Sequence, residues 1–301
     1  MSATITAQEL KPLLENGSVT LIDIMLPEDF ACRRISGACN ACVYEMVFLD
    51  RVAEQSGDRE RHLVLYDESG SSQAAETARA KLERAGYRQV SVLQGGLAAW
   101  REAGFAVESM HSIPEPAAAD GRYLIDTAVS VVEWSGRNIN NRHHGRISVA
   151  EGGLELVAGR PVSGQIVLDM TSITNLDLQD EGWRTLLIRH LLSDDFFDVE
   201  QYPTARFELR GAAPIAGATP GTPNFEVAGT LTIKDVTRPI CFPAVIAPQE
   251  DGSVKAQAAL DIDRTLWNVC YGSGKLYERL GMHLVHDIIS IELFLLARRQ
   301  D

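Results

Sequence analysis

Short apolar runs alternate with helix-like segments over the first third of the chain. The runs at residues 21–24, 62–66 and 90–93 have the length of buried strands, and residues 73–85 repeat small and apolar side chains at helical spacing between two of them. Strands that alternate with helices are typical of a parallel sheet with helices on both faces. We therefore expect an α/β fold for this part of the chain.

The pattern changes to a period of two in the rest of the chain. Residues 165–170, 225–233 and 289–295 alternate apolar with polar side chains, as strands with one buried face do. One helix is expected among them, at residues 183–192. Repeated alternating strands with turn residues between them predict a mainly-β antiparallel sandwich or barrel.

The segment between the two patterns is typical of a linker. Residues 109–121 contain two prolines, three consecutive alanines and no apolar periodicity. We therefore expect a first domain at 1–108, a linker at 109–121 and a second domain at 122–301. The length of 301 residues also suits two domains of ordinary size.

Charge and composition exclude several classes of function. The chain carries 28 basic and 41 acidic residues, for a net charge of −13. A nucleic-acid-binding protein, or one held electrostatically on an anionic membrane, needs the opposite sign. The longest apolar stretch, 288–297, contains Glu292 and is shorter than the roughly 20 residues of a membrane-spanning helix. No nucleic-acid partner and no transmembrane segment are therefore expected.

The N-terminus and the cysteines favour a cytoplasmic location. Residues 1–10 lack the basic and apolar regions of a secretory signal. Five cysteines are too few and too irregularly spaced for a disulfide scaffold. We therefore expect reduced thiols and a cytoplasmic protein.

Several separated motifs in the first domain resemble the rhodanese-like family. They are LID at 21–23 with EDF at 28–30 and ISGA at 35–38, the strand LVLY at 63–66, and QGGLAAW at 94–100 followed by Gly104. The resemblance extends over nearly all of residues 5–108. It implies a parallel sheet with helices on both faces, and a sulfur-transfer loop that starts after residue 66.

The loop of this family begins with a cysteine, whose thiolate takes up a sulfane sulfur cradled by backbone N–H groups. The corresponding residues here are Asp67, Glu68, Ser69, Gly70, Ser71 and Ser72. Asp67 stands in the place of the cysteine, Glu68 and Ser72 replace basic residues, and Met25 replaces an arginine. A carboxylate cannot carry a sulfane sulfur, and each like-charge contact with thiosulfate at ~5 Å costs about 3 kcal/mol. We expect a degenerate loop without sulfurtransferase activity.

An alternative makes the first domain an enzyme that uses a non-standard cysteine. Cys39 and Cys42 have the C-x-x-C spacing of a redox pair. Such pairs lie at a helix N-terminus, where the helix dipole lowers the thiol pKa. The resemblance instead places Cys39 and Cys42 in a short strand or loop, where they face opposite ways. Buried or bystander thiols are the favoured interpretation, and a redox role for the pair stays open.

Two longer motifs in the second domain resemble the YceI-like family, also called polyisoprenoid-binding. One is HLLSDDFFDV at 190–199, and the other is GTLTIKDVTRP at 229–239. The resemblance covers about 122–297. It implies a lipocalin-like, eight-stranded antiparallel barrel that holds a long apolar ligand, and a bacterial origin. The chain departs from the family pattern at His286, where glycine is usual, and at 276–280, which resembles an extra helical turn.

The inward-facing side chains of such a barrel decide whether it is hollow. Eight strands enclose a space that side chains can fill or that one small ligand can occupy, and the resemblance favours the ligand. The predicted lipid contacts are Trp134, Leu168, Met170, Phe207, Leu209, Val227, Leu231, Leu260, Ile291 and Leu293. The predicted headgroup contacts are Tyr277, Arg279 and His283, on the condition that the turn at 276–280 closes that end of the barrel.

No metal site is expected. His143 and His144 are adjacent and so face opposite ways on a strand. His283 and His286 have a spacing that suits one face of a helix but not of a strand. No cluster of cysteines or carboxylates in the sequence completes a zinc ligand set.

The leading hypothesis is a cytoplasmic binding protein rather than an enzyme. Its barrel would sequester an isoprenoid, an isoprenoid quinone or a fatty amide-like lipid without any required cofactor, and the first domain would be a regulatory or docking module. The rival hypothesis is a sulfurtransferase or redox enzyme with a lipid or quinone acceptor. A third interpretation is structural, with the first domain mediating a homodimer.

Overall fold

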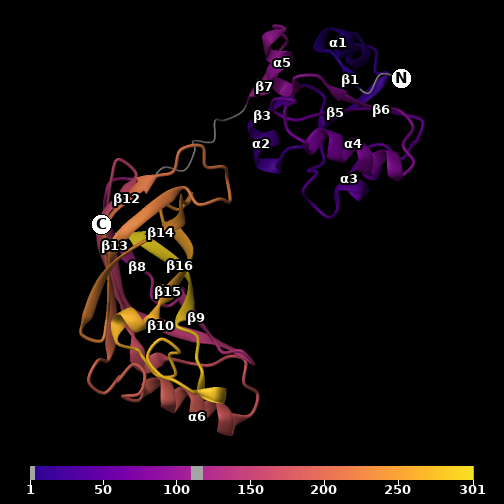
Figure 1. Cartoon of the computed structure of the whole chain (residues 1–301). Coiled ribbons are helices and arrows are strands. Elements are labelled where there is room, and N and C mark those ends of the chain that lie inside the picture. The colour runs from indigo at the N-terminus through magenta and orange to yellow at the C-terminus, as the bar shows by residue number, and fades with distance from the viewer. Residues whose placement is uncertain (1–3, 110–117, 301) are drawn as a thin grey trace. The chain divides into compact units, whose positions relative to one another are not determined.

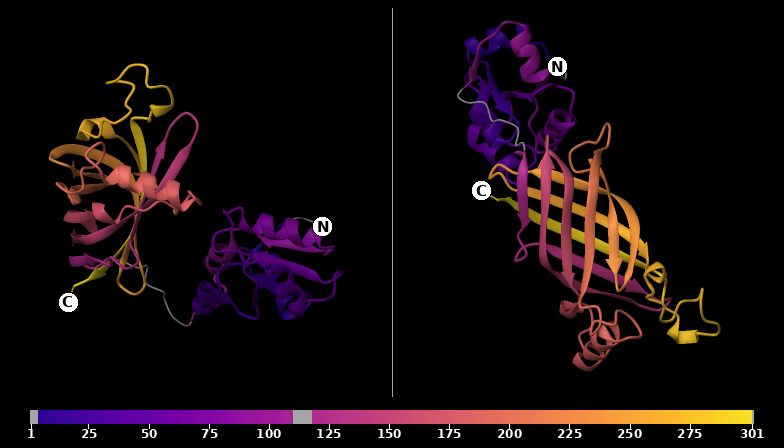
Figure 2. Two further views of the ribbon diagram at one scale, coloured as in Figure 1. Left: turned by 90° about the horizontal axis from the view of Figure 1, so that it is seen from below. Right: turned by 90° about the vertical axis from the view of Figure 1, so that its left-hand side faces the viewer.

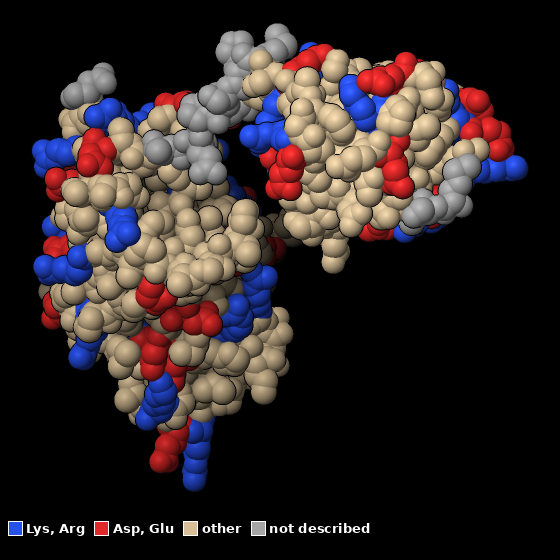
Figure 3. All heavy atoms as spheres, turned by 90° about the horizontal axis from the view of Figure 1, so that it is seen from above, with Lys and Arg blue, Asp and Glu red and all other residues tan. Residues whose placement is uncertain are grey.

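The computed structural model describes residues 4–109 and 118–300. The chain divides into two compact units, residues 1–115 and 116–301, and each unit is described by itself (Figure 1). No helix in the described part of the chain is long and apolar enough to cross a membrane. On the face shown in Figure 3, acidic and basic side chains are interspersed.

The first unit is built on a five-stranded sheet in which all strand pairs are parallel. The strand order is β1-β6-β5-β2-β4. The strands are β1 (Thr4–Ile5), β2 (Val19–Asp23), β4 (Cys39–Asn40), β5 (His62–Tyr66) and β6 (Val90–Leu93). A separate antiparallel pair joins β3 (Arg33–Ile35) to β7 (Val107–Ser109).

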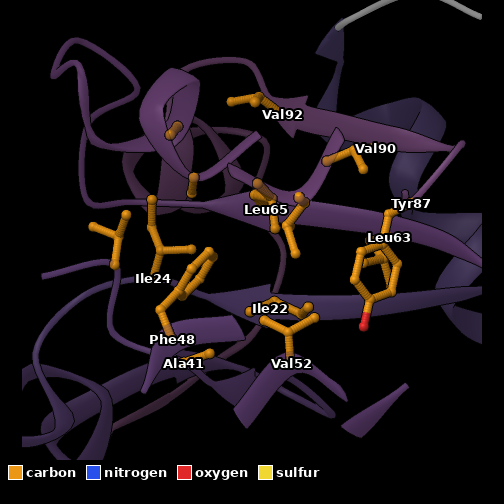
Figure 4. Close-up of a cluster of buried hydrophobic side chains, with 14 residues drawn as sticks. Ile22, Ile24, Ala41, Phe48, Val52, Leu63, Leu65, Tyr87, Val90 and Val92 are labelled. Atoms are coloured by element: carbon orange, nitrogen blue, oxygen red, sulfur yellow. The ribbon is translucent and has the colours of Figure 1, made fainter. Parts of the chain in front are cut away.

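Helices cover both faces of this sheet, as the alternating pattern predicted. They are α1 (Ala7–Glu15), α2 (Pro27–Cys32), α3 (Phe48–Gln55), α4 (Ala74–Arg84) and α5 (Gly96–Glu102). Helices α3 and α4 pack on one face, where Phe48 and Val52 of α3 meet Ile22, Leu63 and Leu65 of the sheet (Figure 4). Helices α1 and α5 pack on the other face. Both faces are apolar because each strand is buried on both sides.

The second unit is a single antiparallel sheet that closes on itself. The sheet order is β11-β12-β13-β14-β15-β16-β8-β10-β9, and a further pairing of β10 with β11 closes the barrel (Figure 2). The strands are β8 (Gly121–Ile125), β9 (Val131–Arg137), β10 (Arg142–Val157), β11 (Arg160–Asp169), β12 (Thr204–Pro214), β13 (Phe225–Ile233), β14 (Val236–Pro248), β15 (Val254–Asp263) and β16 (Ile288–Arg299).

Strands β8 and β9 share one position in the barrel. Strand β8 pairs with residues 153–156 of β10, and β9 pairs with residues 142–147 of the same strand. Both also pair with β16. At the break between them, the Oγ of Ser130 accepts a hydrogen bond from the N–H of Leu296 on β16, at 3.1 Å. The barrel therefore has eight strand positions, as the family resemblance implied.

One end of the barrel carries most of its irregular structure. Helix α6 (Glu181–Leu192) lies there, with its first turn capped by Asp180, whose carboxylate accepts from the N–H of Trp183 at 2.9 Å. The short helices η1 (Met170–Ser172), η2 (Arg264–Trp267) and η3 (Gly281–His283) complete this end. The C-terminus lies at the opposite end (Figures 1 and 2).

The extra helical turn was predicted at 276–280, but the structure places it a few residues later. Those residues form turns and bends, and the helical turn is η3, at Gly281–His283. Arg279 adopts a left-handed φ of 57°, which interrupts a right-handed helix before it can form. The loop from η2 to β16 therefore extends outward rather than lying across the barrel end as a short helix (Figure 2).

Candidate functional site

The barrel interior contains two apolar cavities that meet end to end. The first, of about 140 Å³, lies among the strands away from α6, and the second, of about 290 Å³, lies at the α6 end. Four side chains line both cavities: Val132, Leu168, Leu231 and Ile291. A water molecule needs only about 10–15 Å³ of such space, so the barrel is hollow rather than filled by its own side chains.

All ten side chains predicted as lipid contacts line these cavities. The period of two in the strands explains this result, because alternate residues of each strand face the interior. Leu168, Leu231 and Ile291 line both cavities; Phe207, Leu209, Val227, Leu260 and Leu293 line the first; Trp134 and Met170 line the second. Contact with a lipid is not itself observed, and it stays a prediction.

A glycine on an inward position makes room for a large ring. Gly229 lies between Val227 and Leu231 on β13, and a Cβ there would be 2.5 Å from ring carbons of Phe207. The ring of Phe207 also packs against Phe242, with centroids 5.7 Å apart. The GTLTI sequence that begins at Gly229 thus sets the shape of the first cavity as well as forming a strand.

The two cavities differ in polarity. The first is lined almost entirely by apolar side chains. The second is mostly apolar but also receives polar groups, all from the α6 end of the barrel: Arg137, Asn138, His143, His190, Arg264 and Tyr271. The combined space therefore suits a long apolar molecule with one polar end directed toward α6.

The predicted headgroup residues are not the ones that the structure brings to the cavity. Tyr277, Arg279 and His283 lie exposed on the loop between η2 and β16, outside both described cavities. The loop extends outward from the barrel (Figure 2). The condition for assigning these three side chains as headgroup contacts is therefore not met, and other polar side chains line the second cavity.

Arg264 holds the loop at the α6 end in place. Its side chain is 2% exposed, and its guanidinium donates to the backbone carbonyls of Val269 (2.5 Å), Val285 (3.2 Å) and His286 (3.0 Å). Burial lowers the pKa of this guanidinium from its ordinary value. The carboxylate of Asp287 lies 3.8 Å away. One buried cation therefore joins both ends of the loop 265–287 to the barrel.

His143 and His144 both approach the same carboxylate. The Nδ1 of His143 lies 2.8 Å from Asp177 and the Nδ1 of His144 lies 3.5 Å from it. Burial acts to raise the pKa of Asp177, but hydrogen bonds from the backbone of His144 and from the side chains of His143 and Asn175 outweigh it and hold that pKa below its usual value. Strand alternation alone did not predict this meeting, since Asp177 comes from a distant loop.

Metal binding has no candidate site in the described residues. Among residues 4–109 and 118–300, no group of three or more His, Cys, Asp or Glu side chains is arranged to hold a metal ion. His283 and His286 lie in the exposed loop before β16. His190 has one carboxylate neighbour, Asp195, at 3.5 Å.

In the first unit, the carboxylate of Asp67 accepts hydrogen bonds from two donors of its own loop. One oxygen accepts from the N–H of Gly70 at 2.5 Å, and the other accepts from the hydroxyl of Ser72 at 2.6 Å. The loop packs closely on the start of α5: a Cβ at Gly96 would lie 2.4 Å from the carbonyl oxygen of Asp67. Gly95 and Gly96 both have positive φ, which allows this contact.

The remaining charges near this loop are acidic or paired. Glu68 lies 3.1 Å from Arg33. Asp23, fully buried at the end of β2, accepts from the backbone N–H of Met25 at 2.8 Å. Burial raises the pKa of Asp23 to about 6, against opposing hydrogen bonds. The loop at residues 67–72 therefore contains no cysteine, and two of its side chains, Asp67 and Glu68, are carboxylates.

The cysteines of the first unit do not form a pair. All five cysteines in the described residues are free thiols. Cys39 lies in β4 and is partly buried, whereas Cys42 is 0% exposed. An incoming substrate would have to displace packed side chains to reach Cys42, which disfavours the redox interpretation of this C-x-x-C.

Comparisons with known proteins agree with this division. A profile of the YceI-like domain matches residues 123–297, more than half of the chain, and a profile of the rhodanese-like domain matches residues 6–103. A curated relative, an HTH-type transcriptional regulator of Mycobacterium tuberculosis, is 36% identical over 104 residues. That match spans 35% of this chain and 44% of the relative, so the chain covers less than half of the relative's length.

Solved structures similar to each unit were also found. BcnA of Burkholderia cenocepacia is 25% identical, with a TM-score of 0.45 over 57% of this chain and 98% of BcnA. A polyisoprenoid-binding domain of Saccharophagus degradans is 15% identical, with a TM-score of 0.45 over 59% of this chain and 98% of that domain. A rhodanese-like domain from Anabaena is 32% identical, with a TM-score of 0.31 over 40% of this chain and 89% of that domain. By the match over residues 123–297, the chain belongs to the YceI-like domain family and carries a rhodanese-like domain before its barrel.

Proposed function

We propose that the barrel binds one long apolar molecule, such as an isoprenoid, an isoprenoid quinone or a fatty amide-like lipid. The observation that carries this proposal is the pair of adjoining cavities, which share four lining side chains and are mostly apolar, with polar groups at one end. Each CH₂ removed from water contributes about 0.8 kcal/mol, so ten buried methylenes offer about 8 kcal/mol before ordering costs. A tail of that length needs no charged partner to be retained.

The ligand is expected to lie with its polar end toward α6. Arg137, His143 and Tyr271 line the second cavity there, whereas the first cavity offers almost no polar group. A polar group placed in the first cavity would lose its hydrogen bonds to water without replacement, at a cost of about 1–3 kcal/mol or more. The opposite orientation is therefore disfavoured.

Bound lipid is the direct test of the proposed function. Native mass spectrometry of the purified full-length protein should show a bound species of low mass, and solvent extraction should release a hydrophobic molecule. Stripped protein should take up an isoprenoid quinone or a long-chain amide when either is offered. A protein that carries no such species and takes up neither probe would contradict the proposal.

We further propose that the rhodanese-like domain is a non-catalytic docking or regulatory module. The support is Asp67, whose carboxylate accepts hydrogen bonds from the N–H of Gly70 and the hydroxyl of Ser72. These residues lie in the loop where the family carries its thiolate. A cytoplasmic location and a homodimer formed through this domain stay predictions.

No thiosulfate:cyanide sulfurtransferase activity is expected from the full-length protein. The variant Asp67→Cys should restore little activity, because Glu68, Ser72 and Met25 still leave the loop without its basic residues. A sulfur-transfer assay checks both proteins. Wild-type turnover that disappears when Cys32, Cys39 or Cys42 is replaced would instead establish the enzyme hypothesis.

A further inference from the structure

The α6 end of the barrel exposes an unusual number of large apolar side chains. Half of those exposed by the described barrel residues lie in three segments: the turn between β9 and β10, the segment with α6, and the loop between η2 and β16. Met282 is 82% exposed, Ile139 is 78% exposed and Trp183 is 66% exposed. We define the α6-end patch as Ile139, Trp183, Leu186, Leu276, Tyr277 and Met282. Clustered exposure of this kind marks an interaction surface, whereas scattered apolar residues do not.

The same three segments also line the second cavity. Asn138 comes from the turn that carries Ile139, and Tyr271 comes from the loop that carries Met282. Helix α6 faces both ways: Leu187 and Leu191 line the cavity, while Trp183 and Leu186 are exposed. The exposed side of α6 is mixed, with Glu181 and Arg189 near the apolar Trp183 and Leu186, as on a helix that meets an interface between polar and apolar surroundings. The residues of the α6-end patch therefore lie on the same three segments that line the second cavity.

We propose that the α6-end patch docks on the surface of a lipid bilayer and that ligand enters and leaves the barrel there. This inference rests on the proposed function, because it concerns how the bound lipid is exchanged. Moving a tail through water exposes its CH₂ groups to water, which is unfavourable in proportion to the apolar area exposed. A cavity that opens against a bilayer avoids this cost, because the tail passes directly between two apolar surroundings.

The composition of the patch suits the boundary between headgroups and acyl chains. Trp and Tyr favour that boundary, and Trp183 and Tyr277 supply one of each. Charge makes a smaller contribution, because the chain is strongly acidic and Glu181 and Asp180 lie beside Trp183. The partner is therefore a bilayer of zwitterionic lipid, bound by apolar insertion rather than by attraction to anionic headgroups.

Vesicles of phosphatidylcholine test the docking directly with the full-length protein. Co-sedimentation should show binding by the wild type, and raising the salt from about 0.1 M to about 1 M should leave it largely unchanged. The double variant Trp183→Ser with Leu186→Ser should bind about tenfold or more weakly, since two inserted side chains are lost. The matched control, Leu124→Ser with Val157→Ser, alters exposed apolar residues on β8 and β10 and should bind within about twofold of the wild type.

Quenching by brominated lipid locates the contact. Trp100 and Trp267 are buried, at 3% and 2% exposed, whereas Trp134 lines the second cavity and reports lipid that enters the barrel. The part of the quenching that comes from docking should therefore be the part that is lost in Trp183→Phe. Native mass spectrometry of the same proteins reports bound lipid separately from docking. If the protein holds a lipid but does not bind vesicles, the docking proposal is wrong and the proposed function stands. The same conclusion follows if the two double variants weaken vesicle binding equally. Vesicle binding by a protein that never holds a lipid would overturn ligand exchange at this surface together with the proposed function.

Discussion

Leu231 lies where the two cavities of the barrel meet. The variant Leu231→Trp should place its ring in this space, displace the ligand and lower the free energy of unfolding by less than about 1 kcal/mol. In a filled core the same substitution would cost ~1–3 kcal/mol through overpacking. Thermal or chemical unfolding together with native mass spectrometry checks both effects.

Leu156 provides the matched control for this substitution. It is 1% exposed and packed in the barrel core, but it lies outside both described cavities. The variant Leu156→Trp should therefore lose ~1–3 kcal/mol of stability and retain the ligand in whatever fraction remains folded. If Leu231→Trp lost as much stability as Leu156→Trp and still retained its ligand, the junction would not be part of the binding site.

Asp23 should make the stability of the first domain depend on pH. Burial raises its pKa from 3.8 to about 6 in the folded state, so folding favours the protonated carboxyl. Its contribution to stability is complete below the unfolded pKa and is lost as the pH rises through about 6. A shift of about two pKa units corresponds to about 3 kcal/mol. The difference in unfolding free energy between Asp23→Asn and the wild type should therefore change by about 3 kcal/mol between pH 4 and pH 7. A difference that does not change with pH would contradict a raised pKa for the buried Asp23 carboxyl.

The loop between η2 and β16 depends on one buried arginine. Replacing Arg264 by Gln removes donors to three backbone carbonyls, of Val269, Val285 and His286. Losing such a buried network should lower the free energy of unfolding by about 3–5 kcal/mol. Hydrogen exchange should rise in residues 265–287 while the barrel strands remain protected, and bound ligand should leave faster.

Lys275 is the control for this loop, because it is half-exposed and contacts Asp263 and Asp287 through ion pairs at the surface. The variant Lys275→Gln should cost less than about 1 kcal/mol. Equal effects of the two substitutions on hydrogen exchange would mean that Arg264 does not hold the loop.

The strands were predictable from the sequence because their signal is local. Alternation with a period of two identified the inward face of β13 through Val227 and Leu231. It also placed the other predicted strand residues toward the interior, whereas Met170 begins η1. The polar end of the cavity was not predictable in this way. His143 meets Asp177 across a separation of 34 residues, and Arg264 bonds carbonyls up to 22 residues away. Such contacts depend on how the loops fold back, for which the pattern of apolar residues carries no information.

The hollow interior was likewise beyond the sequence alone. Whether eight strands leave a cavity depends on the summed volumes of side chains that face one another across the barrel. Gly229 illustrates the difficulty, since the ring of Phe207 from the neighbouring strand occupies the space that a side chain at Gly229 would need. The family resemblance supplied the expectation that the residues themselves left open. In the first domain the family resemblance located the loop, and Asp67, Glu68 and Ser72 then predicted that it is degenerate.

The whole chain should behave as two independently folding domains. Its two compact units have separate apolar cores, two on the faces of the α/β sheet and two within the barrel. Limited proteolysis should therefore cut first within residues 109–121, where two prolines and small residues offer no apolar anchor. Each fragment, expressed alone, should unfold cooperatively, and the barrel fragment should retain the lipid found in the full-length protein. An unfolded fragment would mean that the domains share stabilising contacts, and a folded barrel fragment without lipid would mean that the rhodanese-like domain takes part in ligand retention.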